Sequence, residues 1–379
     1  MSNYTDFFTN LKQNENCGEK GRLLEALLNS FQRGNTLSRT ELAEMKQFVF
    51  EEINKLTALI PTLANYKAKD EAFYYEDKLV GLFTFLCAKN VAVSDEEINK
   101  INVLVKLVAE YQVLETAVNE TFKLQTITPE DVKKVIEIAK SIKDEYQKGL
   151  LFQGLLHYEK QIGKFTAEAK AETANYIASE TERYLKKKEK LTEDEINNLE
   201  IVSDICKHFI CEKTVPLLQQ ILTLPHNNIR YYALDTLIAC KGAIPDGVIA
   251  ELAQDLNYAN LTYYLLETNR LLHLYPQEYA DAEYLAKSDM VHWLTYPTEL
   301  GKMPDEIEFL GKVKVKREEY YVFKYKSDSD NLSDDLKGEW LVGWSSDEGG
   351  TFSHFDKLSE YEKKKPAKTL KAIRKTLKA

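Results

Sequence analysis

The sequence predicts a mainly helical protein, a stack of helical pairs with a small antiparallel β-meander and one more helix at the carboxy-terminal end. Three observations lead to this fold class. Apolar residues recur at helical spacing from the start of the chain to about residue 300. Two segments inside this region repeat each other at a fixed offset. After residue 303 the apolar residues alternate with polar ones, which is the pattern of strands.

The composition is that of a folded, soluble protein. Hydrophobic residues make up 44% and charged residues 29% of the 379-residue chain. No basic segment followed by an apolar run begins the sequence, and no apolar stretch has the roughly 18 residues that a membrane span needs. The five cysteines are scattered and odd in number, which argues against a disulfide framework. We therefore expect a cytoplasmic location and no membrane partner.

The charge is unevenly distributed. The chain carries a net charge of −10. Residues 357–379 hold nine Lys or Arg and two Glu, a net charge of +7, so residues 1–356 carry −17. A body this acidic is a poor general binder of nucleic acid phosphates. The charge instead favours a basic protein or peptide as partner, with no nucleic acid expected.

The helical region contains clear signals for helix starts. Ser38, followed by Glu41 three residues later, predicts a capping box. Ser94, Thr128 and Thr192 each precede acidic first-turn residues and predict amino-terminal caps. The helices that we expect after the first two span residues 69–88, 94–123, 128–161, 166–188 and 192–211.

The clearest repeat lies between residues 214 and 274. "IRYYAL" and "LTYYLL" align at an offset of 32 residues. Each lies in the second helix of an expected helical pair. The first pair begins with the helix 214–224, and the second pair consists of helices 245–256 and 259–274. The run Pro225-x-x-x-Ile229-Arg230-x-x-Ala233-x-x-x-Leu237 resembles the turn and second helix of HEAT or armadillo-type repeats. In the second copy Thr262 replaces the arginine and Asn269 the leucine. The resemblance implies a right-handed superhelix, with the second helices along its concave surface.

The strand-like region forms a second domain. We expect repeats over residues 1–303, irregular up to residue 200 and clearest over 201–303, and a β-meander plus helix over 304–379. Three or four strands are expected, from "IEFLGKVKVK", "EYYVFKYKS", "EWLVGWS" and "GTFSHF". A terminal repeat needs its apolar side covered. The module is therefore interpreted first as a cap, and second as a binding site.

No catalytic or metal-binding motif is present in the sequence. The glycines form neither of the common phosphate-binding loops, and no nucleophile elbow or metalloprotease pattern occurs. Cys206, His208 and Cys211 lie close together, but their spacing suits buried helix cysteines better than a zinc site. We therefore expect no enzyme activity, no cofactor and no metal.

The candidate binding residues are aromatic residues and one arginine. Tyr231 and Tyr263 occupy equivalent positions of the two repeats, and Arg230 precedes the first of them. Tyrosine is enriched at interfaces, although these rings would also serve to pack one repeat on the next. Trp340 and Trp344 are the second group of candidates, on one face of the expected sheet.

These patterns together predict a non-enzymatic scaffold or adaptor that binds a basic protein or peptide. An inhibitory, immunity-like protein that sequesters a basic enzyme is one version of this function. The alternatives are a nucleic-acid repair protein similar to the HEAT-like DNA glycosylases, which the acidic body opposes, and ligand or glycan binding by the tryptophan-bearing sheet.

Overall fold

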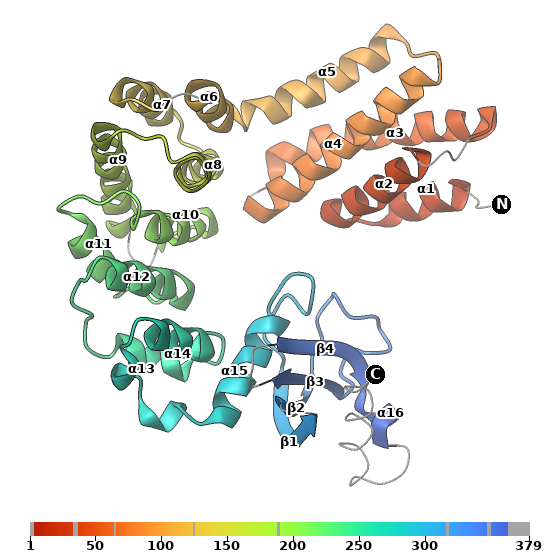
Figure 1. Ribbon diagram of the computed structural model, residues 1–379. Coiled ribbons are helices and arrows are strands. Elements are labelled where there is room, and N and C mark those ends of the chain that lie inside the picture. Colours follow the sequence, from red (N-terminus) through yellow and green to blue (C-terminus); the bar gives the residue numbers. More distant parts are fainter. Residues whose placement is uncertain are drawn as a thin grey trace. The chain divides into compact units, whose positions relative to one another are not determined.

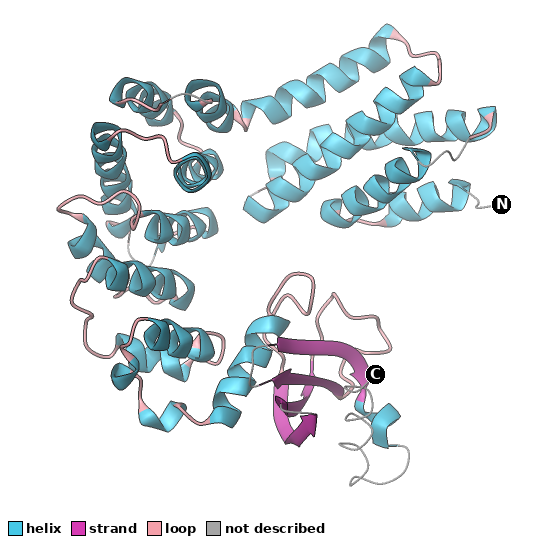
Figure 2. Cartoon of the chain, in the orientation of Figure 1, coloured by secondary structure: helices cyan, strands magenta, loops and turns pink. Residues whose placement is uncertain are grey.

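The computed structural model describes residues 4–32, 37–63, 66–123, 126–187, 190–315, 318–346 and 350–362. It confirms the predicted fold class: helices follow one another as far as Leu294, and an antiparallel sheet begins at Glu306 (Figures 1 and 2). The chain divides into two compact units, Met1–Cys211 and Glu212–Ala379. The second unit therefore joins the clearest repeats to the sheet, whereas the sequence suggested a boundary after residue 303.

The described residues of the amino-terminal unit are helical apart from turns, short loops and one isolated bridge between Ile127 and Phe165. Its α-helices are α1 (Tyr4–Gln13), α2 (Cys17–Gln32), α3 (Arg39–Leu59), α4 (Tyr66–Ala88), α5 (Asp95–Glu110), α6 (Val113–Phe122), α7 (Pro129–Ser141), α8 (Glu145–His157), α9 (Ala167–Leu185) and α10 (Glu193–Ile205).

The predicted helix starts are confirmed. Ser38, Ser94, Thr128 and Thr192 are the N-cap residues of α3, α5, α7 and α10, and each accepts a hydrogen bond from the third backbone N–H of its helix. In all four the acidic side chain at that third position bonds back to the cap, which completes a capping box.

Two of the expected helices are each broken in two. The segment 94–123 forms α5 and α6, which meet at Gln112, and the segment 128–161 forms α7 and α8. The second break has a local cause, because Ile142 is extended and the Asp144 side chain accepts a hydrogen bond from the N–H of Gln147 as the cap of α8. The periodic apolar pattern continues across both breaks, so periodicity alone did not reveal them.

Helices α2 and α4 pack unusually closely because glycines lie at their contact. A Cβ atom at Gly21 would lie 2.5 Å from Cδ1 of Tyr74, and one at Gly18 would lie 2.9 Å from Cγ of Glu71. Further along, a Cβ at Gly81 of α4 would meet a methyl of Leu28 at 3.1 Å. The core between these helices is continuous from α1 to the start of α8.

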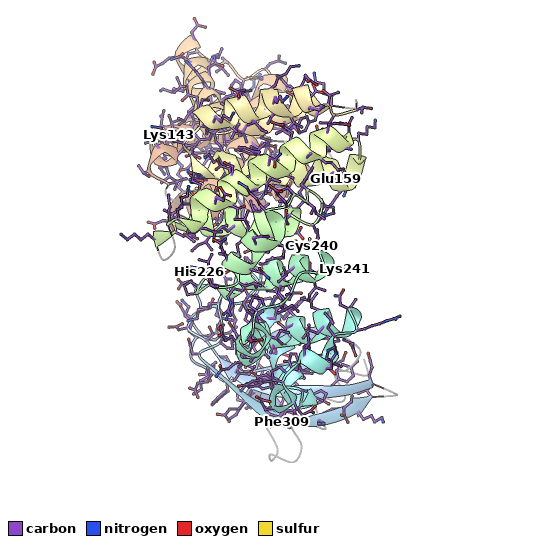
Figure 3. All side chains as sticks on the ribbon, turned by 90° about the vertical axis from the view of Figure 1, so that its left-hand side faces the viewer. Lys143, Glu159, His226, Cys240, Lys241 and Phe309 are labelled. Carbon is purple, nitrogen blue, oxygen red and sulfur yellow. The ribbon has the colours of Figure 1, made fainter. Side chains whose placement is uncertain are left out.

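The carboxy-terminal unit begins with the repeated helical pairs. Its helices are α11 (Thr214–Ile221), α12 (Asn227–Ala239), α13 (Val248–Gln254), α14 (Ala259–Thr268) and α15 (Ala282–Leu294). Helix α11 packs on α12 and α13 on α14, as the repeat predicts. His226 and Cys240 mark the two ends of α12 in Figure 3. Helix α14 ends before the expected residue 274, and Arg270 just beyond it has a positive φ of 59°.

The predicted β-meander is confirmed with four strands in the order β1-β2-β3-β4. All neighbours are antiparallel, and a register shift between Phe309 and Gly311 bulges the first strand. The strands are β1 (Glu306–Val315), β2 (Glu318–Lys326), β3 (Leu341–Ser346) and β4 (Gly350–Lys357), followed by the short helix α16 (Leu358–Glu362). The helix expected at the end of the chain lies outside the described residues.

Each face of the sheet carries its own apolar cluster. Phe309, whose position Figure 3 shows, lies 5.7 Å from Phe323 between ring centroids, and this face packs on Met290 and Leu294 of α15. The opposite face gathers Val313, Val315, Val322, Val342 and Trp344 beneath Leu358. One face of the module therefore packs on α15.

Gly21→Ala should destabilise the amino-terminal unit. The added methyl overlaps the ring of Tyr74, whose hydroxyl is held by Glu25 at 2.9 Å. Overpacking costs about 1–3 kcal/mol, against about 1 kcal/mol gained in helix propensity. Urea unfolding followed by helical circular dichroism measures the net loss. In a Tyr74→Ala background the same change should stabilise instead, and equal losses in both backgrounds would contradict the close-contact explanation.

A candidate binding groove in the amino-terminal unit

The amino-terminal unit contains a groove of about 540 Å³ between α2, α4, α6 and α8. None of its residues was among the sequence-predicted candidates. The groove is lined by Gly18, Arg22, Asp70, Glu71, Phe73, Tyr74, Gln112, Glu115, Tyr146, Leu150 and Gln153.

The groove depends on features that the sequence analysis missed. The break between α5 and α6 makes Gln112 the N-cap residue of α6 and brings Glu115 into its first turn. The break before α8 likewise places Tyr146 at the start of that helix. On the opposite side Gly18 leaves room for the side chain of Glu71. Uninterrupted helices would not have brought these residues to the same groove.

Aromatic rings form the apolar part of the lining. Phe73 and Tyr146 are 6% and 1% exposed, and their ring centroids lie 5.6 Å apart in an edge-to-face arrangement. Tyr74 adds a third ring, which is fixed by a hydrogen bond from its hydroxyl to Glu25. Phe73 and Tyr146 therefore form a fixed floor, and the half-buried Tyr74 is the ring that a ligand can contact most directly.

Acidic groups dominate the electrostatics of the groove. Asp70, Glu71 and Glu115 face one cation, Arg22. The hydroxyl of Tyr146 donates to Asp70 at 2.9 Å, and burial raises the pKa of the Asp70 carboxyl despite this bond. Within the described part of the chain Asp70 and Glu115 make no ion pair, and Glu71 has only Lys67 at 3.9 Å. The groove therefore has an excess of negative charge.

A lysine beside the groove shows how the protein itself holds an ammonium group. Lys69 is 6% exposed, and its Nζ lies 5.4 Å from the ring centroid of Tyr111 and 5.3 Å from that of Tyr146. Asp144 completes the site at 3.2 Å. Tyr146 is shared with the groove, which offers the same combination of rings and carboxylates to an external cation.

Arg230, predicted as a binding residue, is buried in a network between repeats. Its Nε donates to the carbonyl of Leu222 at 3.0 Å, and its Nη1 to Asn227 at 2.9 Å. Its Nη2 forms an ion pair with Glu251 of the next helical pair. With 7% exposure it caps the end of α11 and ties α12 to α13.

The predicted tyrosines are half-buried and pack on other tyrosines. The ring centroid of Tyr231 lies 6.0 Å from that of Tyr258, and the ring centroid of Tyr263 lies 5.2 Å from that of Tyr275. Burial raises the pKa of Tyr231 to about 12. These contacts agree with the packing alternative, whereas the neighbouring Tyr264 is 45% exposed.

The two predicted tryptophans differ in their surroundings. Trp344 is 2% exposed and packs with Val322 and Val342 in the sheet core. Trp340 is half-buried, and its ring lies 3.9 Å from Nζ of Lys324 and 4.3 Å from Nζ of Lys326. The chain's own lysines therefore already contact the indole ring that a sugar would stack on.

The described residues contain no group of three or more His, Cys, Asp or Glu placed to hold a metal ion. Cys206 is buried, Cys211 is half-buried, and all five cysteines are free thiols. Across the described ranges, no helix combines the length and apolarity required to cross a membrane.

Comparisons with protein-family models, curated proteins and solved structures found no match. The interpretation of the groove therefore rests on its own chemistry. The sequence did contain one signal for it, the run "KDEAFYY" from Lys69 to Tyr75, which combines carboxylates and rings within two helical turns. This run forms a groove only together with Gln112 and the residues of α8, which are distant in the sequence.

Arg230→Met should lower the free energy of unfolding of the carboxy-terminal unit by about 2–3 kcal/mol, because it leaves a buried carbonyl and Asn227 without their donor. Glu251→Gln should cost under about 1 kcal/mol, since the Glu251 side chain is 61% exposed. All three tryptophans lie in this unit, so tryptophan fluorescence during urea unfolding reports on it. Unchanged stability in Arg230→Met would contradict the structural role.

Proposed function

We propose that this protein is a non-enzymatic, cytoplasmic interaction scaffold whose acidic groove binds a basic segment of a partner protein. The observation that carries the proposal is the lining of the groove, where three carboxylates and three rings face a single arginine. Carboxylates attract Lys and Arg side chains, and rings bind the same cations through their faces.

The overall charge supports the same class of partner. The body of the chain, residues 1–356, carries −17, which raises the encounter rate with a cationic protein and repels nucleic acid. The helical pairs α11–α12 and α13–α14 support a HEAT-like scaffold, since such repeats offer extended surfaces to partners. Sequestration of a basic enzyme is one form that this function would take.

The other functions suggested by the sequence receive less support. A repair protein of the glycosylase type needs a basic groove for phosphates, whereas this groove is acidic. Glycan stacking on the sheet would have to displace the lysines that contact Trp340.

An Asp70→Asn/Glu115→Gln double variant should bind a lysine- and arginine-rich peptide about tenfold more weakly than the wild type. Each exposed charge pair contributes up to about 1 kcal/mol, and about 1.4 kcal/mol corresponds to a factor of ten. Isothermal titration calorimetry at low and high salt measures the effect, and the affinity of the wild type should fall as salt rises.

The matched control is Asp77→Asn/Glu120→Gln, which removes two exposed carboxylates from the same two helices outside the groove. This variant should bind almost as the wild type does. Equal weakening in both double variants would show a general charge effect, and no weakening in either would remove the groove from the proposal.

Arg22→Gln should strengthen binding of the same peptide by about two- to fivefold, because it removes the one cation of the groove lining, which repels a cationic ligand. Arg22 is exposed, so the variant should fold normally. Lys106→Gln provides a control for the loss of one exposed cation from outside the groove lining. Weaker binding by Arg22→Gln would contradict repulsion between Arg22 and the cationic ligand.

A further inference from the structure

A second cavity lies among the first four helices. It has a volume of about 480 Å³ and shares no lining residue with the acidic groove. This volume lies within the usual range for small-molecule sites. The cavity is lined by Lys12, Asn14, Glu15, Cys17, Lys20, Glu52, Lys55, Leu56, Leu59 and Tyr75.

A buried ion pair forms one wall of the cavity. Glu52 is 1% exposed and accepts hydrogen bonds from Nζ of Lys20 at 2.7 Å, from Nζ of Lys55 at 2.7 Å and from the hydroxyl of Tyr75 at 2.9 Å. Three donors therefore hydrogen-bond to this carboxylate. Its lysine partners hold its pKa below the usual value in spite of burial.

The ammonium of Lys20 has fewer hydrogen-bond partners than the carboxylate. Lys20 is 7% exposed, yet among the described residues its only hydrogen-bond acceptor is Glu52, with the ring of Tyr75 at 5.4 Å. An ammonium group has three N–H donors, and leaving donors of a buried charge unmet is costly. Because Lys20 lines the cavity, a further acceptor can reach it from there.

The charges of the cavity also call for an anion. The lining holds three lysines, Lys12, Lys20 and Lys55, and two carboxylates, Glu15 and Glu52, which leaves one positive charge in excess. Lys12 pairs with Glu51 outside the lining, and Glu15 and Lys55 are both exposed, so Lys20 is the buried cation of the cavity. The thiol of Cys17 adds no charge at neutral pH, because burial raises its pKa.

The remaining lining is apolar. Leu56 and Tyr75 are buried, and Leu59 extends the same wall with 37% exposure. One unbalanced cation suits a monoanion, whereas a polyphosphate would require several more. We propose that this cavity binds a small organic carboxylate, with its carboxyl group on Lys20 and its apolar body against Leu56, Leu59 and Tyr75.

The cavity contains its own reporter, because Cys17 is part of the lining. Hexanoate should slow the alkylation of Cys17 by N-ethylmaleimide at least tenfold at millimolar concentration, while the exposed Cys87 should react at an unchanged rate. Peptide mass spectrometry of the full chain resolves the two sites. Hexanamide, which has the same shape without the charge, should protect Cys17 far less.

Two variants test the residues. Lys20→Met/Glu52→Gln removes the buried pair but keeps an acceptor for Tyr75, and it should abolish protection by hexanoate. Leu59→Glu places a negative charge beside the carboxylate at a partly exposed position, so it should fold and also lose protection. Leu23→Glu, at a similarly exposed position of α2 outside the cavity, should keep it.

Three outcomes would overturn the proposal. If hexanoate did not change the alkylation rate of Cys17, the cavity would not bind an organic carboxylate. Equal protection by hexanamide would show that the ammonium does not select the ligand. Equal protection by inorganic phosphate would exclude a preference for an organic carboxylate. The proposal is independent of the peptide-binding groove, since the variants of the two sites share no residue.

Discussion

The close approach of α2 to α4 at Gly21 is the contact on which the amino-terminal unit depends. It brings Tyr74 against the backbone of α2 and so fixes how the two helices are rotated about their axes. Gly18 and Arg22 then line the acidic groove, while Cys17 and Lys20 line the second cavity. A bulkier residue at position 21 would separate the helices and alter both sites together, since a packed core adjusts only partially to added volume.

The same contact places neighbouring residues of α4 in two different sites, the acidic groove and the lysine-lined cavity. Tyr74 lines the groove with Asp70 and Glu71, and Tyr75 lines the cavity with its hydroxyl on Glu52. Consecutive helical residues point about 100° apart, so one helix can serve two sites without sharing a side chain. Of the groove carboxylates Asp70 is exposed and Glu71 and Glu115 are half-buried, whereas the buried lysine is held by its carboxylate partner.

Sequence reasoning succeeded where the determining interactions were local. The capping boxes at Ser38, Ser94, Thr128 and Thr192 involve residues three apart, and the meander follows from alternation along each strand. It failed at the break before α8, because an interrupted helix keeps the same apolar spacing on both sides of the interruption.

The site residues show a further limit of sequence reasoning. The sequence pattern predicts Arg230 as a binding residue, but its partners are the carbonyl of Leu222 and, from the next helical pair, Glu251. Only tertiary contacts distinguish an arginine that holds repeats together from one that meets a partner. The groove was missed for the matching reason: Asp70 and Glu115 are 45 residues apart in the sequence.

The two proposed sites differ in how far their charged groups are exposed to solvent. The groove carboxylates lie near solvent, so mobile ions screen them over a Debye length of about 8 Å at physiological salt. The Lys20–Glu52 pair is shielded by protein, where the effective dielectric is lower and salt penetrates poorly. Binding in the groove must therefore weaken with ionic strength, and binding in the cavity must weaken less. The difference follows from burial, because in both sites a protein charge attracts a ligand of opposite charge: carboxylates attract a cation in the groove, and the Lys20 ammonium attracts a carboxylate in the cavity.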